Sequence, residues 1–322
     1  MLLIEDLADL KFINNIVFGG AGFIGSHLIE KLLESNQNVV CIDNLSSGNL
    51  KNLIHLKDNK NFYFIKHDIL NEIRCKSPIE KIWHLACPAS PNSYQKDPLL
   101  TIRTNYEGTL NILNLANSCN SKLLFTSTSE IYGITKKNPQ FEDMSISLQT
   151  GSPRACYSEG KRIAETLVIN YGKLNSIDFR IARIFNTYGP RLGENDGRVI
   201  SSFIYQAFNK KNLTIYGDGM QTRSFCYITD LIDGLIKLMN SNYSFPINLG
   251  NDDEITILEL ANLIREKINP EIDLEFHKLP IDDPKYRKPS LDLAKKYLDW
   301  NPIVNLEKGL DKFIKFYKIN NC

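Results

Sequence analysis

Short apolar runs alternate with longer amphipathic segments through the first 190 residues of the chain. Apolar residues recur at helical spacing after the first of these runs, and again over Pro98–Ser118 and Tyr157–Leu174. Strands that alternate with helices predict a parallel sheet that is covered by helices on both faces. The predicted strands are Ile16–Phe18, Val39–Ile42, Phe62–Ile65, Ile82–Leu85, Leu123–Thr126 and Phe179–Ile184.

The pattern changes after Gly189 and Pro190, where proline and glycine breaks become denser and the apolar runs shorter. We therefore expect a first domain over residues 1–190, to which segments from about 224–250 return, and a smaller α/β lobe over residues 191–322. Such a lobe would close over the carboxyl ends of the sheet, where open α/β sheets bind ligands. Its predicted elements are helices at Val199–Phe208, from about Thr229, at Ile257–Ile268 and at Leu291–Tyr297, and strands at Leu213–Tyr216 and near Ile247.

A glycine-rich turn joins the first predicted strand to the first predicted helix. Gly19, Gly22 and Gly25 form a G-x-x-G-x-x-G pattern, and Phe23 and Ile24 begin the helix. Glycines let the backbone approach a pyrophosphate, whose charge then meets the free N–H groups and the positive end of the helix. The pattern predicts a Rossmann-type, doubly wound parallel sheet that binds a dinucleotide, although a purely structural turn could use the same glycines.

An acidic residue, Asp43, ends the second predicted strand about 20 residues farther along the chain. A carboxylate at this position accepts hydrogen bonds from the adenosine ribose and repels a 2′-phosphate, which favours NAD over NADP. The loop from Asn44 through Ser47 to Gly48 would then lie beneath the ribose. Asp68 follows the third predicted strand, where it is placed either to meet the adenine or to remain a solvated loop carboxylate.

A tyrosine and a lysine lie one helical turn apart at Tyr157 and Lys161, so both side chains share one helix face. A nearby ammonium favours the phenolate, and we expect Lys161 to lower the tyrosine pKa toward the range of a catalytic base. By itself, this spacing is also common on the surfaces of helices. The Ser/Thr-rich end of the fifth predicted strand supplies Thr128, Ser129 and Glu130. Together these features predict a Thr/Tyr/Lys set that deprotonates an alcohol as its hydride leaves for a nicotinamide.

Charge and cysteine content narrow the class of protein. The 38 lysines and arginines balance 37 acidic residues, and a net charge of +1 provides no field for nucleic acid or an anionic membrane. An anionic ligand would have to be held by local arginines. The seven cysteines contain no C-x-x-C pair and no Cys/His cluster at zinc spacing. We therefore expect no metal, and reduced, mostly buried thiols in the cytoplasm. No apolar run approaches the ~18 residues of a membrane span.

Longer motifs resemble the extended short-chain dehydrogenase/reductase family, and within it the UDP-glucuronate decarboxylases (UDP-xylose synthases), from about residue 13 to residue 315. The chain departs from the family pattern at residues 44–48, which lack the usual bulky aromatic residues and threonine, and at residues 134–154. The motifs that carry the resemblance are His84–Pro91 (HLACPASP), Thr126–Gly133 (TSTSEIYG), Tyr157–Glu165 (YSEGKRIAE), Ala182–Arg191 (ARIFNTYGPR), Asp196–Val199 (DGRV), Tyr216–Phe225 (YGDGMQTRSF) and Asp282–Ser290 (DDPKYRKPS).

The resemblance implies NAD-dependent decarboxylation of UDP-glucuronate to UDP-xylose. Tyr157 would take the C4 hydroxyl proton while NAD⁺ accepts the hydride, Lys161 would bond the nicotinamide ribose, and Thr128 would orient the substrate hydroxyl. The 4-keto intermediate would lose CO₂ and then be reduced again by the bound NADH. Glu130 would disfavour the substrate carboxylate in the ground state, relay a proton to C5 through water, or merely cap the loop.

Three other functions are open at this point. A UDP-uronate 4-epimerase and a decarboxylase that stops at the 4-keto pentose would use the same cofactor site and the same Tyr/Lys pair. A non-catalytic NAD-binding scaffold is a more remote alternative, because Thr128, Tyr157 and Lys161 are all present. Family analogy also implies a homodimer that forms through the helices near residues 98–118 and 157–174.

The remaining ligand contacts rest on the resemblance alone. Arg198 would contact the cofactor or the hinge between the lobes. Guanidinium groups suit bidentate binding of phosphate and carboxylate, so several arginines are assigned to the nucleotide sugar. The further cofactor positions are Ile69, Leu85 and Thr187, and the substrate positions are Arg103, Ser129, Asn186, Tyr216, Arg223 and Arg287.

Overall fold

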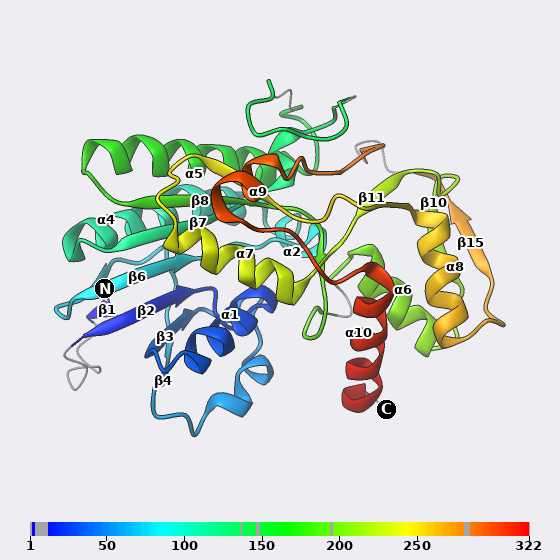
Figure 1. Cartoon of the computed structure of the whole chain (residues 1–322), viewed down its shortest axis with the longest axis horizontal. Coiled ribbons are helices and arrows are strands. Elements are labelled where there is room, and N and C mark those ends of the chain that lie inside the picture. The colour runs from blue at the N-terminus through cyan, green and yellow to red at the C-terminus, as the bar shows by residue number, and fades with distance from the viewer. Residues whose placement is uncertain are drawn as a thin grey trace.

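A seven-stranded parallel sheet forms the centre of the molecule (Figure 1). The computed structural model describes residues 2–3, 12–135, 137–145, 149–193, 196–279 and 284–321. From one edge of the sheet to the other, the strand order is β13-β8-β7-β6-β2-β3-β4, which confirms the predicted α/β class with a doubly wound parallel sheet. These strands are β2 (Ile13–Phe18), β3 (Val39–Asp43), β4 (Phe62–Lys66), β6 (Ile79–His84), β7 (Lys122–Thr128), β8 (Phe179–Ile184) and β13 (Pro246–Leu249).

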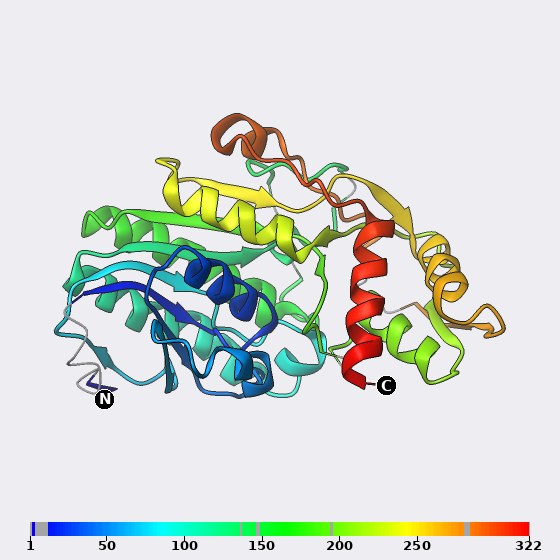
Figure 2. The same ribbon diagram turned by 60° about the horizontal axis from the view of Figure 1, so that its bottom comes forward.

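Successive residues of the central strands point to opposite faces of the sheet, and both faces are buried. On β2, Val17 belongs to one hydrophobic cluster, while Ile16 and Phe18 belong to another. Helices of both halves of the chain cover the first face, as Figure 2 shows for the blue and yellow helices. That face is covered by α1 (Phe23–Glu34) and α7 (Ile228–Asn240), and the other by α4 (Thr109–Cys119) and α5 (Ala155–Leu174).

The direction of strand addition reverses beside β2. The chain runs outward from β2 through β3 to β4, and then places β6, β7 and β8 on the other side of β2. The carboxyl ends of β2 and β6 therefore flank a topological switch point, which is the usual ligand crevice of an open α/β sheet. Gly19 directly follows β2, Leu85 directly follows β6, and Thr128 ends β7, so the predicted site residues converge there.

A smaller group of elements, called the second lobe below, lies beyond the carboxyl ends of the sheet, at the right of Figure 1. Within it, β10 pairs with β15 in parallel, and β11 pairs with β14 antiparallel. The bounds are α6 (Val199–Phe208), β10 (Leu213–Tyr216), β11 (Thr222–Ser224), β14 (Glu254–Thr256), α8 (Ile257–Ile268), β15 (Leu274–His277) and α10 (Leu306–Asn321). The return of α7 and β13 to the main sheet agrees with the expected course of residues 224–250, while the division into two domains stays a prediction.

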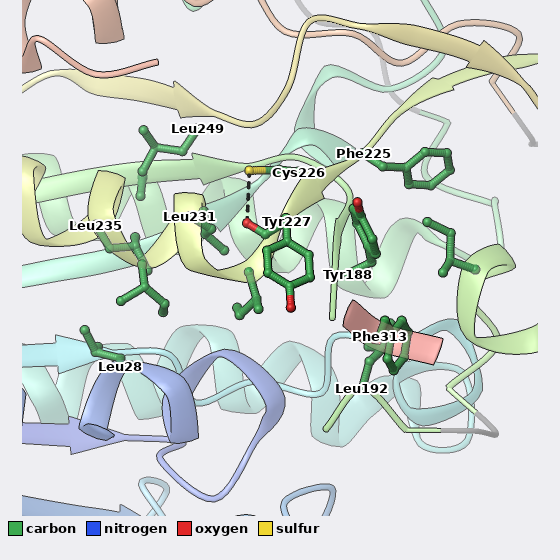
Figure 3. Close-up of a cluster of buried hydrophobic side chains, with 14 of the residues drawn as sticks. Leu28, Tyr188, Leu192, Phe225, Cys226, Tyr227, Leu231, Leu235, Leu249 and Phe313 are labelled. Carbon is green, nitrogen blue, oxygen red and sulfur yellow. Dashed lines mark hydrogen bonds between the residues drawn. The ribbon is translucent and has the colours of Figure 1, made fainter. Parts of the chain in front are cut away.

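One hydrophobic cluster extends from the sheet into this smaller group of elements (Figure 3). It includes Leu28 of α1, Leu231 of α7 and Phe313 of α10. Tyr188 lies in the same cluster, and its hydroxyl donates a hydrogen bond to the Leu306 carbonyl (3.1 Å). Gly309 permits this approach, because a Cβ at that position would overlap the Tyr188 hydroxyl oxygen. Helix α10 thereby fastens the second lobe to the elements around the central sheet.

The segment predicted as a helix over Pro98–Ser118 is helical throughout, but it contains a π-helical turn that was not predicted. The structure has α3 (Pro98–Arg103), then a π-helical turn at Thr104–Gly108, and then α4. The side-chain amide of the buried Asn105 donates to the Thr101 carbonyl (2.9 Å), which competes with the regular backbone hydrogen bond to that oxygen. Hydrophobic spacing cannot distinguish such a widened turn from a regular helix.

The other elements are short. Among the described cysteines, Cys41, Cys156 and Cys226 are buried and three others are partly exposed, so the expectation of mostly buried thiols holds for half of them. In the part of the chain that the structure describes, no helix has the length and apolar character of a membrane span. The short elements are β1 (Leu2–Leu3), β5 (Ile73–Arg74), α2 (Pro91–Tyr94), β9 (Thr187–Tyr188), β12 (Cys226–Tyr227), α9 (Asp292–Leu298) and single turns of 3-10 helix at Leu50–Asn52, Ile54–Leu56 and Ser129–Tyr132.

Candidate active site

Two large cavities meet at the carboxyl ends of the central strands. The first, of about 480 Å³, is lined by the glycine turn and by the ends of β6, β7 and β8. The second, of about 960 Å³, extends between the sheet and the second lobe. The two cavities share one wall, to which Glu130, Asn186, Thr187, Arg198 and Arg287 all contribute. The molecule can therefore hold two neighbouring ligands side by side.

The glycine turn lies at the floor of the first cavity. Gly19 has a φ of +78°, and a Cβ there would lie 2.8 Å from the Ala86 backbone nitrogen, so only glycine fits between β2 and β6. Gly22 is the N-cap of α1 and offers no side-chain acceptor to the helix. The first N–H groups of α1 are therefore available to an anion in the cavity, which Phe23, Ile24 and Gly25 also line.

Asp43 occupies the far end of this crevice, in a small adjoining pocket of about 90 Å³. Its two carboxylate oxygens accept hydrogen bonds from the backbone N–H groups of Ala21 (3.0 Å) and Leu45 (2.8 Å). Burial raises the pKa of Asp43, and these two hydrogen bonds oppose that effect. Each oxygen keeps a lone pair, so a ribose hydroxyl would find an acceptor there. The same pocket is lined by Asn44, Ser47, Gly48, Ile69 and Leu85.

Asp68 is engaged with the protein itself. Its carboxylate oxygens accept hydrogen bonds from the side chain of Asn44 (2.9 Å) and from the backbone N–H of Leu70 (2.9 Å). It lines none of the three cavities described here. Asp68 thus shapes the loop beside Asn44, and its contact with an adenine stays a prediction.

Tyr157 and Lys161 share the buried face of α5, as their spacing predicts, and both line the first cavity with Thr128. The Lys161 ammonium donates to the Thr126 carbonyl at the end of β7 (2.8 Å). The Tyr157 ring stacks on the ring of Tyr94, with centroids 4.9 Å apart and an angle of 5° between the planes. Helix α5 and strand β7 thereby bring a phenol, an ammonium and a hydroxyl to one point beside the glycine turn.

The expected effect of Lys161 on the tyrosine is wrong for the protein alone. Burial raises the pKa of Tyr157, and the charges of Cys87 and Glu130 raise it further. A hydrogen bond with the Thr128 hydroxyl lowers it. Burial also lowers the pKa of Lys161. The reason is that the low-polarity surroundings penalise both charged forms, while the ammonium is directed at the Thr126 carbonyl.

Glu130 forms the polar centre of the shared wall. One of its oxygens, Oε1, accepts from Arg154 Nη1 (3.2 Å) and from Arg287 Nη1 (3.3 Å). All three side chains are largely withdrawn from solvent. The hypothesis that Glu130 merely caps the loop is therefore incomplete, because its carboxylate orients two guanidinium groups toward the cavities. Ser129, its buried neighbour, also lines the first cavity.

Four of the six predicted substrate residues line the second cavity, while Ser129 lines only the first and Arg103 lines neither. Arg223 and Tyr216 line it from the second lobe, and Arg198 borders both cavities and donates to the Ala89 carbonyl (3.2 Å). Arg103 lies outside the three cavities described here, so its contact with the substrate stays a prediction. Its exposed guanidinium instead forms two 2.9 Å hydrogen bonds with Glu107, because the two side chains are one helical turn apart.

Sequence reasoning missed three site residues. Tyr94 stacks on Tyr157, Arg154 binds Glu130, and Arg191 lines the first cavity. Arg154 precedes Tyr157 by three residues at the start of α5, so its position on the tyrosine's side of the helix was a usable signal. The first residues of the motif at 282–290 lie outside the described residues. Within the described part of the chain, no three His, Cys, Asp or Glu side chains are grouped to hold a metal.

The residues present fit a dinucleotide. The glycine turn leaves the N-terminal end of α1 open to a pyrophosphate, and the Asp43 oxygens lie at the end of the same crevice. At the other end the buried hydroxyl of Ser127 has no hydrogen-bond partner among the described residues, although it borders the first cavity. A polar group of a ligand would satisfy it, which is consistent with a nicotinamide end near Tyr157.

Comparison with known proteins agrees with this site. A family model described as "NAD dependent epimerase/dehydratase family" matches residues 15–250. UDP-glucuronic acid decarboxylase 1 of Arabidopsis thaliana is 46% identical over 308 residues, which span 96% of this chain and 70% of that protein. UDP-glucuronic acid decarboxylase 1 of Danio rerio is 46% identical over 302 residues, which span 94% of this chain and 72% of that protein.

Solved structures give the same result for the fold. The UDP-glucose 4-epimerase of Thermotoga maritima, solved with UDP-glucose, has a TM-score of 0.87 at 27% identity and covers 95% of this chain and 99% of its own. The UDP-glucuronic acid 4-epimerase of Bacillus cereus, solved with UDP-glucuronic acid and NAD, has a TM-score of 0.84 at 29% identity, with the same coverage. From the matched family model and these relatives, the chain belongs to the NAD-dependent epimerase/dehydratase family, within the extended short-chain dehydrogenases/reductases.

Proposed function

We propose that this protein is an NAD-dependent decarboxylase that converts UDP-glucuronate to UDP-xylose. The observation that carries the proposal is the convergence of Thr128, Tyr157 and Lys161 beside the glycine turn, in a cavity that also contains the Glu130–Arg287 pair. The decarboxylases that match are 46% identical to this chain, whereas the uronate 4-epimerase is 29% identical. The decarboxylase is therefore favoured over the epimerase.

NAD, when bound, would accept a hydride from C4 of the sugar and return it after the carboxyl group has left. The residues that would hold it are those of the glycine turn and Asp43, with Lys161 near the nicotinamide ribose. The positively charged nicotinamide ring of NAD⁺, beside the phenol, would favour the phenolate and offset the effect of burial on the pKa of Tyr157. The protein therefore keeps its tyrosine protonated until it is needed as a base.

Tyr157 would accept the proton of the C4 hydroxyl, while Thr128 fixes the direction of that hydroxyl. Oxidation at C4 makes the sugar a β-keto acid, and the electrons left by CO₂ delocalise into the ketone. Tyr157, by then protonated, would hydrogen-bond the resulting enolate oxygen. A proton from water, relayed by Glu130, would then add to C5 and restore the 4-ketone before the hydride returns to C4. Lys161 is buried, bonded to Thr126 and fixed in orientation, which suits a residue that holds a ribose and the tyrosine together.

The carboxyl end of the sugar would lie near Glu130, Arg154 and Arg287. The Arg287 guanidinium bonds Glu130, two residues after Thr128. We therefore expect it to lie closer to the reacting carbons than its assignment to the diphosphate implied. Arg223 lies on the side of the second lobe and is better placed for the diphosphate. A glutamate shared by two arginines can release one guanidinium to a substrate carboxylate without losing its own partner.

The test is one incubation of the purified protein with UDP-glucuronate, in which CO₂, the nucleotide sugar and A340 are followed together. UDP-xylose and CO₂ in equal amounts, with no net NADH, support the proposal. UDP-galacturonate without CO₂ would identify an epimerase, and a 4-keto pentose with stoichiometric NADH would identify a decarboxylase that stops there. Absence of turnover with every nucleotide sugar tried would favour a non-catalytic scaffold.

We also propose a homodimer, and the cytoplasmic location that the sequence predicts. Apolar side chains are exposed along α3, the π-helical turn and α5, where Leu99 is 73% and Ile102 is 42% exposed, and Tyr106 and Ile163 are similarly open. A patch of this kind is typical of a subunit interface. Sedimentation equilibrium of the protein and of Leu99→Glu tests the dimer, and cell fractionation tests the location.

A further inference from the structure

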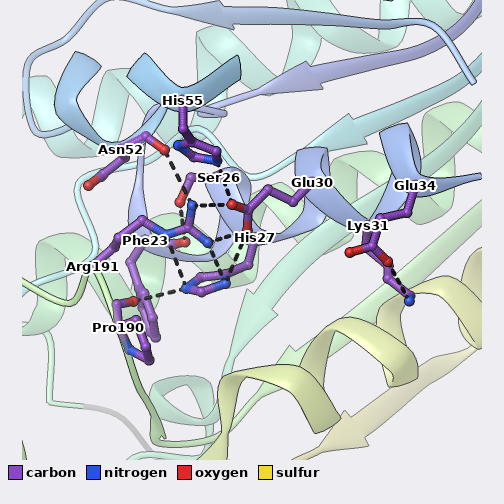
Figure 4. Close-up of polar contacts among 10 residues, drawn as sticks. All are labelled: Phe23, Ser26, His27, Glu30, Lys31, Glu34, Asn52, His55, Pro190 and Arg191. Carbon is purple, nitrogen blue, oxygen red and sulfur yellow. Dashed lines mark hydrogen bonds and ion pairs between the residues drawn. The ribbon is translucent and has the colours of Figure 1, made fainter. Parts of the chain in front are cut away.

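The chain crosses from the sheet to the second lobe through an unusual backbone segment, residues 189–191, which we call the crossing segment. Gly189 has a φ of +148°, and Arg191 has a φ of +68°, which is rare for a residue with a side chain. The Arg191 side chain then turns back and reaches α1, the helix that begins at the glycine turn (Figure 4). Its own contacts therefore hold its backbone in the left-handed region.

Glu30 of α1 is the main partner of Arg191. Arg191 Nη1 donates to Glu30 Oε1 (2.9 Å), and Nη2 bonds Oε2 of the same carboxylate, so the pair is bidentate. Nη1 also donates to the Asn52 carbonyl (3.3 Å). The side chain of Arg191 is only 11% exposed. Burial alone would raise the pKa of Glu30, but hydrogen bonding and charge from Arg191 lower it below its usual range.

His27, one helical turn before Glu30, makes the second connection. One ring nitrogen, Nε2, lies 2.9 Å from the Pro190 carbonyl, and the other, Nδ1, lies 2.6 Å from Arg191 Nη2 (Figure 4). Arg191 Nε also lies 3.3 Å from Nε2. Because the guanidinium can only donate and the Pro190 carbonyl can only accept, we infer that Nδ1 accepts from Nη2 and that Nε2–H donates to Pro190, which leaves the longer Nε contact without a hydrogen bond. Thus α1 holds both Pro190 and Arg191. We call these five residues the hinge clamp: His27, Glu30, Asn52, Pro190 and Arg191.

Two residues of the hinge clamp line the proposed cofactor cavity. Arg191 and Asn52 line the first cavity together with Gly22 and Phe23 at the start of α1. Arg198, seven residues farther along the chain, borders both cavities. The separation between the glycine turn and Arg198 therefore depends on how firmly this crossing segment is fastened to α1.

We propose that Arg191 is a positioning residue, which fastens the crossing segment to the cofactor helix through Glu30 and His27 and thereby sets the affinity for NAD. This inference rests on the proposed cofactor and substrate sites. Glu30 neutralises the guanidinium, so Arg191 acts through placement of the crossing segment and of Arg198. Loss of the Arg191 side chain widens the first cavity. It also weakens binding of the nucleotide sugar, because Arg198 borders the second cavity as well.

The test compares Arg191→Gln, Arg191→Lys and Glu30→Gln with the unaltered protein, using calorimetric NAD binding, thermal unfolding, and kcat and KM for UDP-glucuronate. Arg191→Gln is expected to weaken NAD binding about tenfold or more and to raise KM, with a smaller effect on kcat at saturation. Arg191→Lys keeps the charge but loses the fork, and restores only part of the affinity. Glu30→Gln keeps size and is expected to weaken NAD roughly three- to tenfold, so a test remains if Arg191→Gln fails to fold.

Arg180→Lys is the matched control. Arg180 is also a buried arginine of this region of the chain, and it bonds Asp178 and the Ser241 carbonyl, but it lines neither large cavity. It is expected to lower the unfolding temperature while NAD affinity stays within about twofold. Unchanged NAD affinity in Arg191→Gln, or an equal loss of affinity in Arg180→Lys, would overturn the proposal. If the unaltered protein binds NAD but makes no UDP-xylose, the proposed function fails while this binding test still applies.

Discussion

Tyr157 and Lys161 are both buried, and burial favours the neutral form of each side chain. A neutral phenol beside the glycine turn is a poor base by itself, which explains why the site combines it with a cofactor that brings positive charge. The Thr128 hydroxyl and the stacked Tyr94 ring fix the position of the phenol. At the residue scale, the proposed base Tyr157 would thus stay protonated until the cofactor is bound.

Tyr157→Phe is expected to reduce the rate of decarboxylation by roughly 10²–10⁴, because it removes the proton acceptor but keeps the stacked ring. NAD binding should be nearly unchanged. Single-turnover kinetics and calorimetry measure the two effects. Tyr132→Phe is the control, because Tyr132 is buried and bonded to Asn248 but lines neither large cavity. Wild-type rates in the Tyr157 variant would show that oxidation at C4 does not come first.

Asp43→Asn should weaken NAD binding by about 1.5–3 kcal/mol, because a charge-assisted contact to the ribose is lost. Discrimination against NADP should relax at the same time. An amide also cannot accept through both of its polar atoms, so one of the hydrogen bonds from Ala21 and Leu45 is lost as well. Calorimetry with both cofactors is the measurement, and Asp58→Asn is the control, because Asp58 is exposed and lines none of the three cavities. Equal NAD affinity in Asp43→Asn and the unaltered protein would remove Asp43 from the ribose site.

Arg287→Ala should raise KM for UDP-glucuronate, since it removes a guanidinium from the wall between the cavities. A hydrogen bond to a charged group in a largely desolvated site contributes about 1.5–3 kcal/mol, which corresponds to roughly 10- to 150-fold in KM. NAD affinity should change little. Steady-state kinetics and the inhibition constant for UDP separate the possibilities. A KM effect with an unaltered UDP constant places Arg287 at the sugar, whereas two unaltered constants place it outside the substrate site.

Secondary structure followed from sequence in several segments that have buried faces. Helices α6 and α8 and strands β8 and β10 have the bounds that hydrophobic spacing predicted. The π-helical turn could not be predicted, since it depends on one side-chain amide of Asn105. Helix α10 was missed although its buried residues Leu310, Phe313, Ile314 and Tyr317 recur at helical spacing, so a usable local signal was present.

The candidate site was predictable to the extent that its motifs are local. The glycine turn and the Tyr157–Lys161 pair each lie within one element and its ends, so spacing alone placed them. The pairing of Arg103 with Glu107 did not follow from the motifs, and the assignment of Arg103 to the substrate stays a prediction. The pairing of Glu130 with Arg287 joins residues 157 positions apart, and only tertiary structure reveals it.

Helix α1 and the crossing segment should respond together to acid, because burial and the charge of Arg191 lower the pKa of His27 to about 4. The unfolded histidine binds a proton below pH 6.5, whereas the folded one remains neutral, so stability is lost as pH falls from about 6.5 to about 4. Glu30 and His55 also face this ring, and the carboxylate opposes the shift. The loss attributable to His27 is at most roughly 3 kcal/mol.

Urea unfolding of His27→Gln between pH 7 and pH 4.5 measures this effect. The variant is expected to be less stable at pH 7, where it loses the Pro190 contact, but to lose less stability on acidification than the unaltered protein. His277→Gln is the control, since His277 is exposed on the second lobe. Parallel pH profiles for the unaltered protein and His27→Gln would show that another group causes the acid sensitivity.

At the scale of the whole molecule, near-neutral charge leaves recognition of an anionic nucleotide sugar to a few arginines. Arg198, Arg223 and Arg287 all border the second cavity, so the positive charge that the chain lacks on average is concentrated there. Raised ionic strength should therefore affect binding less than in a protein that attracts its ligand through long-range charge, because partly buried pairs are weakly screened.

The wall shared by the two cavities has a thermodynamic consequence. Asn186, Thr187, Arg198 and Arg287 border both spaces, so a ligand on either side changes the surroundings that the other ligand meets. Linkage then requires that dinucleotide and nucleotide sugar alter one another's dissociation constant by the same factor. With positive coupling, a sugar that is still being processed slows escape of the reduced cofactor, and departure of the product loosens it. The same few side chains would then decide both which ligands enter and the order in which they leave.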